Sequence, residues 1–400
     1  MFIPSSTLLT NYANILVNFA LNSGKGIQHG DVVHVRIPET ARPLLGPLTE
    51  VILKAGWHPM IDLIPEWGQT KLFFEHASDE QLTRYADRTM KAKIEDADHL
   101  IVIIADEDPH ELSDIDPKKM MFRQKAGKVY RELRDAKENQ GSFTWTLALY
   151  GTEAMAKEAY MTLEEYREQI INACFLDDAD PIAKWKEVFA YQETIKAKLN
   201  TLKIQSVHLT GEDIDLIVKI WSDRQWLGWS GRNIPSFELF VSPDRRGTQW
   251  RVRFSEPLYH YGKLIKGIQL RFENGLITKA SATEGEDMLL EMISAENANK
   301  IGEFSLTDRR LSRITRFMAD TLYDENVGGQ YGNTHIAVGN AYKDSYIGDP
   351  SIPTPEQRSN MWFNESVVHT DIVSTTNRTV TATLEDGSKM IIYKDGEFVI

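Results

Sequence analysis

The chain has 400 residues, 42% of them hydrophobic and 26% charged, a balance typical of folded globular proteins and not of disordered ones. Its length exceeds that of one typical compact core, so we expect two domains. The formal net charge of −13 argues against nucleic acid or an anionic membrane surface as a partner, because both require a positively charged face. A small cation or the amino end of a peptide suits this charge better.

The sequence carries no pattern of export or membrane insertion. The apolar run in the first twenty residues has no basic segment before it and is interrupted by asparagines, which argues against a signal sequence. No window approaches the roughly 18 apolar residues of a membrane-spanning helix. We therefore expect a cytoplasmic protein. The single cysteine, Cys174, cannot form an internal disulfide and lies among apolar residues, so we interpret it as a core residue.

The first half of the chain alternates between strand and helix patterns. Charged stretches such as residues 124–139 predict helices, and the capping box of Thr162 and Glu165 predicts another that begins at residue 163. Short apolar runs predict strands at residues 31–37, 60–64, 99–105 and 143–150. This alternation predicts a doubly wound α/β domain over residues 1–200.

The pattern changes in the second half. Asn274-Gly275, Asp386-Gly387 and Asp395-Gly396 each lie between alternating apolar runs, which is the signature of tight β-hairpins. Apolar residues at helical spacing predict a helix over residues 309–322. We therefore expect a mainly antiparallel β (α+β) domain over residues 201–400, and we expect it to hold the metal-binding site described next.

Histidines and acids stand in suggestive positions in this second half. His369 and Asp371 lie two residues apart in the predicted strand VVHTDIVST, so they project from the same face and suit a divalent metal, although such pairs also occur by chance. Glu325 and His335 flank a glycine-rich loop. Each of these two alone has an ordinary explanation, as a solvated acid and as a hydrogen-bonded core histidine.

Two further glutamates lie in apolar surroundings. Glu238 is part of IPSFELFVSP, and Glu303 follows a glycine and precedes an apolar run. A buried carboxylate needs a partner, and a cation would serve. Four carboxylates and two imidazoles in one domain are typical of two divalent ions that share a carboxylate. They do not fit a structural zinc site, which prefers thiolates.

Four segments, RNIPSFELFVSP, IGEFSLTD, YDENVGGQYGNTHIAVGNAY and HTDIV, resemble in order and spacing the aminopeptidase T and aminopeptidase S (PepS) family of metallopeptidases. The resemblance covers nearly the whole chain and is most specific in the second half. It implies a cytoplasmic homodimeric exopeptidase that removes amino-terminal residues from peptides. It also implies two divalent ions, which are zinc, cobalt or magnesium in this family.

The resemblance also implies roles for individual residues. Its metal ligands are Glu238 and Asp371 for one ion, Glu325 and His335 for the other, Glu303 as the bridge between both, and His369 as a further ligand or close neighbour. Tyr342 and Glu303 are its catalytic residues. Two such ions lower the pKa of a shared water, and the Tyr342 hydroxyl is the candidate donor to the developing oxyanion.

Two alternatives follow from the same residues. His335, His369 and Asp371 could hold a single ferrous ion in a ring-cleaving dioxygenase, since related dioxygenases resemble this peptidase family. The additional glutamates favour two ions and hydrolysis instead. The second alternative is a non-catalytic peptide- or metal-binding protein, which would keep the ligands but would have no use for Tyr342.

Overall fold

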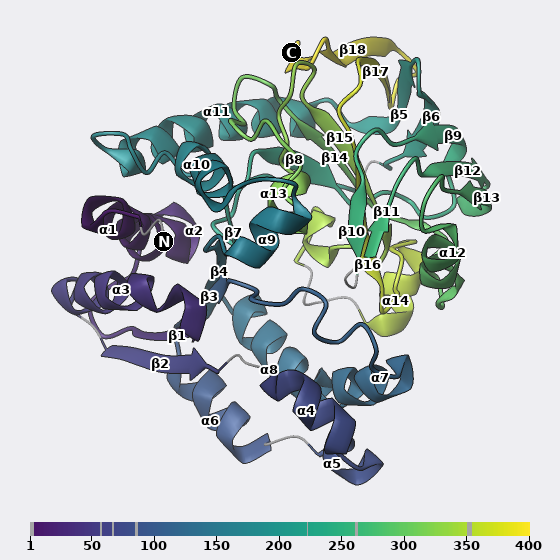
Figure 1. The fold of residues 1–400 in the computed structure, drawn as a ribbon. Helices are drawn as coiled ribbons and strands as arrows, with labels where there is room; N and C mark the ends of the chain where they lie inside the picture. The colour runs from purple at the N-terminus through teal and green to yellow at the C-terminus, as the bar shows by residue number, and fades with distance from the viewer. Residues whose placement is uncertain are drawn as a thin grey trace. The chain divides into compact units, whose positions relative to one another are not determined.

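The computed structural model describes residues 4–56, 58–65, 68–84, 87–221, 223–260, 263–349 and 354–400. The chain divides into two compact units, which are Met1–Trp185 with Ser230–Pro235, and Lys186–Trp229 with Ser236–Ile400. Helix α11 (Pro181–Thr201) crosses this division, so the domain boundary expected after residue 200 falls in its last turn. Figure 1 follows the chain through both units.

A parallel sheet forms the centre of the first unit, with strand order β2-β1-β3-β4-β7 (Figure 1). β1 pairs in parallel with both β2 and β3, so the strand order reverses there, as in doubly wound folds. The strands predicted from the apolar runs are confirmed as β1 (Val32–Pro38), β2 (His58–Ile64), β3 (His99–Ile104) and β4 (Thr144–Leu149), joined by the short β7 (Asn233–Ile234).

Helices cover this sheet. Ile94 of α6 and Leu133 of α8 pack with Leu100 of β3, while α3 packs on β1 and β2 and contacts α1. The predicted capping box of Thr162 and Glu165 is present at the start of α10. The helices are α1 (Ser6–Ile15), a π-helical turn (Leu16–Ala20), α2 (Leu21–Gly24), a 3₁₀ turn (Glu39–Ala41), α3 (Arg42–Lys54), α4 (Gln69–His76), α5 (Asp79–Thr83), α6 (Asp87–Asp96), α7 (Pro117–Ala126), α8 (Lys128–Asn139), α9 (Glu153–Glu158) and α10 (Leu163–Ala173).

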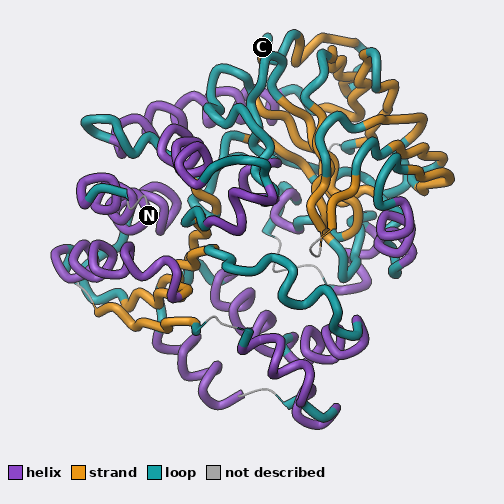
Figure 2. The backbone as a smooth tube through the Cα atoms, in the orientation of Figure 1, coloured by secondary structure: helices purple, strands orange, loops and turns teal. Residues whose placement is uncertain are grey.

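Antiparallel sheets form the second unit, and their strands are orange in Figure 2. The larger sheet has the order β13-β12-β9-β6-β5-β17-β18-β19, and the smaller has the order β16-β15-β14-β8. The larger sheet comprises β5 (Ile204–Gly211), β6 (Ile214–Lys219), β9 (Gln249–Arg253), β12 (Gln269–Glu273), β13 (Leu276–Ser281), β17 (Arg378–Leu384), β18 (Lys389–Lys394) and β19 (Glu397–Phe398). The smaller comprises β8 (Glu238–Val241), β14 (Ile301–Thr307), β15 (Asn333–Gly339) and β16 (His369–Ser374).

The remaining elements of this unit are the ribbon of β10 (Leu258–His260) and β11 (Lys263–Ile265), the helices α12 (Glu286–Ser294), α13 (Thr321–Asp324) and α14 (Pro355–Asn360), and a 3₁₀ turn (Lys343–Ser345). All three predicted hairpins are confirmed, because the predicted dipeptides join β12 to β13, β17 to β18 and β18 to β19. Phe304, Ile336 and Ile372 project from the smaller sheet into a core shared with the larger one. The mixed architecture expected from the sequence, an α/β half followed by an antiparallel β half, is therefore observed.

The helix predicted over residues 309–322 is wrong. The chain is irregular there, and only the last turn, α13, is helical. Ile314 and Met318 are nevertheless fully buried. The spacing of the apolar residues therefore reflects their burial and not a helical backbone. Side-chain groups replace the helical hydrogen bonds, because the Asp324 carboxylate accepts the backbone N–H groups of Met318 and Asp320.

Two other expectations concern single features. Cys174 is fully buried, as expected for a core residue. Across the described ranges, every helix is too short or too polar to cross a bilayer.

Two hairpin glycines allow the cost of backbone conformation to be separated from the cost of a clash. Both have positive φ, +79° at Gly275 and +83° at Gly387, but a Cβ on Gly275 would lie 1.9 Å from the Arg245 carbonyl oxygen, whereas one on Gly387 would meet nothing within 4 Å. We expect Gly387→Ala to lower the free energy of unfolding by about 1–2 kcal/mol. Gly275→Ala should cost about 1–3 kcal/mol more. Thermal and denaturant unfolding measure both, and equal losses would contradict the clash.

Candidate metal centre

The smaller sheet of the second unit presents acids and histidines on one face. Glu303 of β14, Ala337 of β15 and Asp371 of β16 are aligned across the sheet, and Ser305, His335 and Val373 form the next row. Because side chains alternate along a strand, His335, Glu303 and Asp371 project from the face opposite the apolar core. Glu238 stands at the start of β8, paired with Thr307.

His335 lies at the centre of this group. Its Nε2 atom is 3.1 Å from Glu303 Oε1, 3.1 Å from Glu238 Oε2 and 3.7 Å from Asp371 Oδ1. Its Nδ1 atom lies 3.2 Å from the carbonyl oxygen of Glu325. A carbonyl oxygen can only accept, so Nδ1 carries the donated proton and Nε2 is directed at the carboxylates. Glu238, Glu303 and His335 each place one ligand atom within 4.8 Å of the others.

His369 approaches the same carboxylates from β16. Its Nε2 atom is 3.9 Å from Glu303 Oε2 and 3.7 Å from Asp371 Oδ1. Its Nδ1 atom lies 2.8 Å from the Asn340 carbonyl oxygen and donates to it, which fixes the ring in the same way as in His335. The two oxygens of Glu303 thus face different imidazoles.

Glu325 reaches the group through its loop. It follows α13 directly, and its backbone carbonyl accepts hydrogen bonds from His335 and from Asn333 Nδ2. The glycines after it permit the turn. A Cβ on Gly328 would lie 2.7 Å from the Ser312 carbonyl oxygen, and Gly329 has a φ of +60°. The glycine-rich loop therefore returns the chain from Glu325 to His335.

Burial and mutual repulsion perturb the titration of these groups. Burial raises the pKa of Glu303 to about 7, and the Glu238 and Asp371 carboxylates add to this shift. Burial, reinforced by Glu238 and Asp371, also raises the pKa of Glu325 well above its ordinary value. Burial alone would lower the pKa of His335, but its hydrogen bonds to Glu238 and Glu303 outweigh that effect and raise the pKa.

The chemistry of the donors fits divalent cations. Asp371 Oδ1 is a buried carboxylate oxygen that accepts no hydrogen bond from any described residue. Such an oxygen costs free energy unless a cation or a donor compensates it. Oxygen and imidazole ligands together suit zinc, cobalt, manganese or magnesium.

Tyr342 borders this group. Its ring is 4.9 Å from the His369 ring and 5.7 Å from the Phe240 ring, both in edge-on geometry. Tyr342 as a whole is 40% exposed. Partial burial of its phenol group and, after it, the negative charges of Glu303 and Asp371 raise the pKa of Tyr342 well above its ordinary value. Because its pKa is raised, the hydroxyl is protonated near neutral pH. It makes no hydrogen bond to any described residue, so its proton is available for donation.

The seven residues named from the sequence therefore lie in one region, Glu325 through its backbone contact with His335 and Tyr342 through its ring contact with His369. Several supporting residues were not anticipated. Ser305 donates a 2.9 Å hydrogen bond to Glu238 Oε2, and Asn326 donates to Glu325 Oε1 at 3.3 Å. Ser242 accepts the backbone N–H of Tyr342. Ser305 and Ser242 could have been found from the period of two along a strand, counted from Glu303 and from Glu238.

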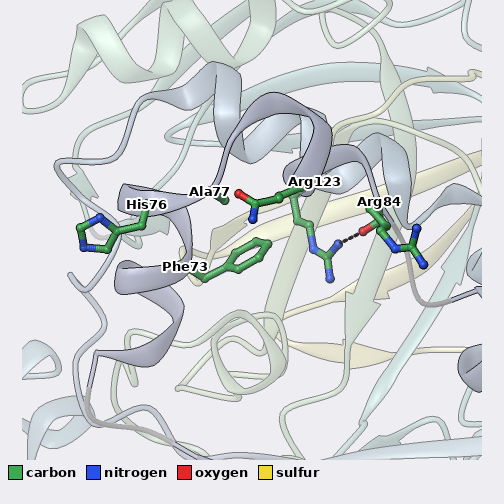
Figure 3. A pocket seen from close by; sticks show the side chains of 6 residues that line it. Phe73, His76, Ala77, Arg84 and Arg123 are labelled. Carbon is green, nitrogen blue, oxygen red and sulfur yellow. Dashed lines mark hydrogen bonds between the residues drawn. The ribbon is translucent and has the colours of Figure 1, made fainter.

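A separate hollow of about 510 Å³ lies in the first unit (Figure 3). Arg123 donates to the backbone carbonyl of Arg84 across it, and Phe73 forms part of its wall. None of the acids or histidines described above lines this hollow, so its size does not make it the metal centre.

Comparisons with known proteins agree with the geometry. The family described as Thermophilic metalloprotease (M29) matches residues 5–398. Aminopeptidase T of Thermus aquaticus is 30% identical over 320 residues, 74% of this chain and 76% of the relative. Aminopeptidase PepS of Streptococcus thermophilus is 25% identical over 424 residues, 98% of each chain.

The fold has a solved counterpart. The structure titled wild-type AmpT from Thermus thermophilus superposes with a TM-score of 0.83, over 98% of this chain and 99% of that chain, at 23% identity. These comparisons do not support the dioxygenase alternative. The chain belongs to the M29 family of metalloproteases.

Proposed function

We propose that the chain is a metal-dependent aminopeptidase that removes amino-terminal residues from peptides with the help of two divalent ions. The observation that carries the proposal is the convergence of carboxylates and imidazoles on one sheet face, with the buried Asp371 Oδ1 lacking a hydrogen bond. The names of the related aminopeptidases support the reaction type. The family resemblance further implies a cytoplasmic homodimer, which we include in the proposal.

Six side chains would hold the ions. The proposed ligands are Glu238, Glu303, Glu325, His335, His369 and Asp371. Glu303 is the proposed bridge, because its Oε1 faces His335 and its Oε2 faces His369. Zinc, cobalt or magnesium would satisfy this donor set. When bound, such a pair of ions supplies a water nucleophile near neutral pH and polarises the scissile carbonyl.

The protein's own groups would do the remaining work. The Tyr342 hydroxyl would donate a hydrogen bond to the oxyanion that develops from the scissile carbonyl, and its raised pKa keeps the proton in place. The free amino group of the substrate would bind an ion or one of the carboxylate oxygens beside it. Such binding of the amino group would restrict cleavage to the chain end. Ser305 and Asn326 would hold Glu238 and Glu325 in fixed orientations.

The first test is metal-dependent release of an amino acid. We expect the protein to hydrolyse amino-acid amides with a free amino group, to lose this activity on chelation and to regain it with zinc, cobalt or magnesium. Elemental analysis should find two ions per chain. An amide with an acetylated amino group should not be cleaved. A single ion per chain in the reactivated protein would overturn the two-ion proposal, and chelator-resistant hydrolysis would overturn the metal dependence.

Removal of the Tyr342 hydroxyl tests its role as oxyanion donor. We expect Tyr342→Phe to lower kcat on the order of 10²–10³-fold, with KM and bound metal unchanged, because the donor acts only as charge develops on the oxygen. Steady-state kinetics and elemental analysis measure these quantities. Tyr346→Phe is the matched control, since it removes a phenol hydroxyl from the same loop. An unchanged kcat in Tyr342→Phe would exclude the catalytic role.

Metal binding should depend on pH in a defined direction. Glu303 has a pKa of about 7 in the folded metal-free protein and roughly 4.3 in an unfolded chain. Its protonation therefore stabilises the metal-free fold, an effect fully present below the unfolded pKa and lost as the pH rises through about 7. Cations need the deprotonated carboxylate, so the rise in melting temperature on adding cobalt should grow from pH 5.5 to pH 8. A pH-independent rise would contradict this linkage.

A further inference from the structure

Strand β8 sends three alternate residues toward the centre. Glu238 opens the strand, Phe240 follows two residues later, and Ser242 stands one residue beyond its end. Glu238 Oε2 lies 3.1 Å from His335, and the Phe240 ring packs edge-on against the Tyr342 ring. Ser242 Oγ accepts the Tyr342 backbone N–H at 2.8 Å. One strand therefore contacts both the centre and the tyrosine beside it.

Ser242 is fully buried, and its N–H, carbonyl oxygen and Oγ all form hydrogen bonds. Its N–H donates to Ser345 Oγ at 3.0 Å, and its carbonyl oxygen accepts from Arg224 Nε at 3.0 Å. Ser345 belongs to the same loop as Tyr342, and its carbonyl oxygen accepts the Gln225 N–H at 2.8 Å. Ser242 thus joins the loop to the sheet at two points, the backbone of Tyr342 and the side chain of Ser345.

The side chain of Tyr342 has few restraints of its own, whereas its backbone is also held by the Ser345 N–H, which donates to the Tyr342 carbonyl oxygen at 3.3 Å. Its side chain is 40% exposed, and its ring makes edge-on contacts with His369 and Phe240 that leave the phenol oxygen without a hydrogen bond from any described residue. The position of that oxygen therefore depends on where the backbone of Tyr342 is held. A hydrogen bond to a fully buried side chain directly after a sheet strand gives a stiffer reference point than loop packing alone.

We propose that Ser242 is a positioning residue that sets the Tyr342 hydroxyl at the distance the reaction requires. This inference rests on the proposed catalytic role of Tyr342. It assigns no contact between Ser242 and the substrate; the serine acts only through the backbone of the tyrosine. A misplacement of about 1 Å can cost on the order of 100-fold in rate, so loss of this one hydrogen bond should be visible in turnover.

The test is a double-mutant cycle. Ser242→Ala should lower kcat by roughly 10–100-fold, with KM and the metal content unchanged. In a Tyr342→Phe background the same substitution should cause no further loss, since a positioning residue has nothing left to position. Thr152→Ala is the control, because Thr152 is a buried hydroxyl of the first unit that also accepts a backbone N–H, from Met155 at 3.1 Å. It should leave kcat unchanged.

A second pair of variants covers the case in which Ser242→Ala does not fold. Ser242→Thr and Ser242→Val have nearly the same shape but differ in the hydroxyl, so the threonine variant should turn over at least tenfold faster at equal melting temperature. Equal rates for this pair would overturn the inference, as would a further loss from Ser242→Ala in the Tyr342→Phe background. If Tyr342→Phe lowers kcat and Ser242→Ala does not, the positioning role falls while the proposed function stands. If neither changes kcat, both roles fall.

Discussion

The constraint on which the second unit depends is compensation of negative charge on a buried sheet face. Glu238, Glu303, Glu325 and Asp371 are all nearly excluded from water. Each ionised carboxylate in such surroundings costs several kcal/mol unless it is paired. His335 and His369 supply at most two positive charges against four negative ones. Without cations the group must retain protons, which is the physical meaning of the raised pKa values of Glu303 and Glu325.

The sheet that carries these charges is also the wall of the apolar core. Along β15, His335 points to the charged face and Ile336 to the core, and along β16 Asp371 and Ile372 divide in the same way. A slip of one residue in the pairing would exchange the two faces and bury charge in the core. Stability therefore fixes the strand register, and the register in turn fixes which side chains can meet a cation.

Sequence reasoning succeeded where a local pattern has one physical cause. The short aliphatic run of β3 is typical of a strand buried on both faces. Asn274-Gly275 supplies two positive φ values, +51° and +79°, that suit a two-residue hairpin. The shared orientation of His369 and Asp371 follows from the two-residue period of side chains along a strand. The helix predicted over residues 309–322 is absent because the spacing of Ile314 and Met318 reflects only their burial. The backbone N–H of Met318 donates to the Asp324 side chain instead, and no periodicity in the sequence reveals such a partner. The approach of Glu325 to His335 likewise depends on a loop path that spacing does not encode.

Glu238 at the start of β8 and Ser242 after its end contact different parts of the site, the charged group and the Tyr342 backbone. A catalytic hydroxyl on a loop loses orientation readily, whereas alternate residues of one strand keep fixed separations. Glu238 begins β8 and Ser242 directly follows its end, so the buried carboxylate and the proposed anchor of the Tyr342 backbone lie on one short continuous segment. Preorganised donors stabilise a transition state without reorganising during the reaction. This requires the metal ligands and the hydrogen-bond donor to be held by the same rigid part of the fold. We infer that this common framework is β8, the edge strand of the smaller sheet, with the residue that follows it, and that it holds the Tyr342 backbone at a fixed distance from the buried acids.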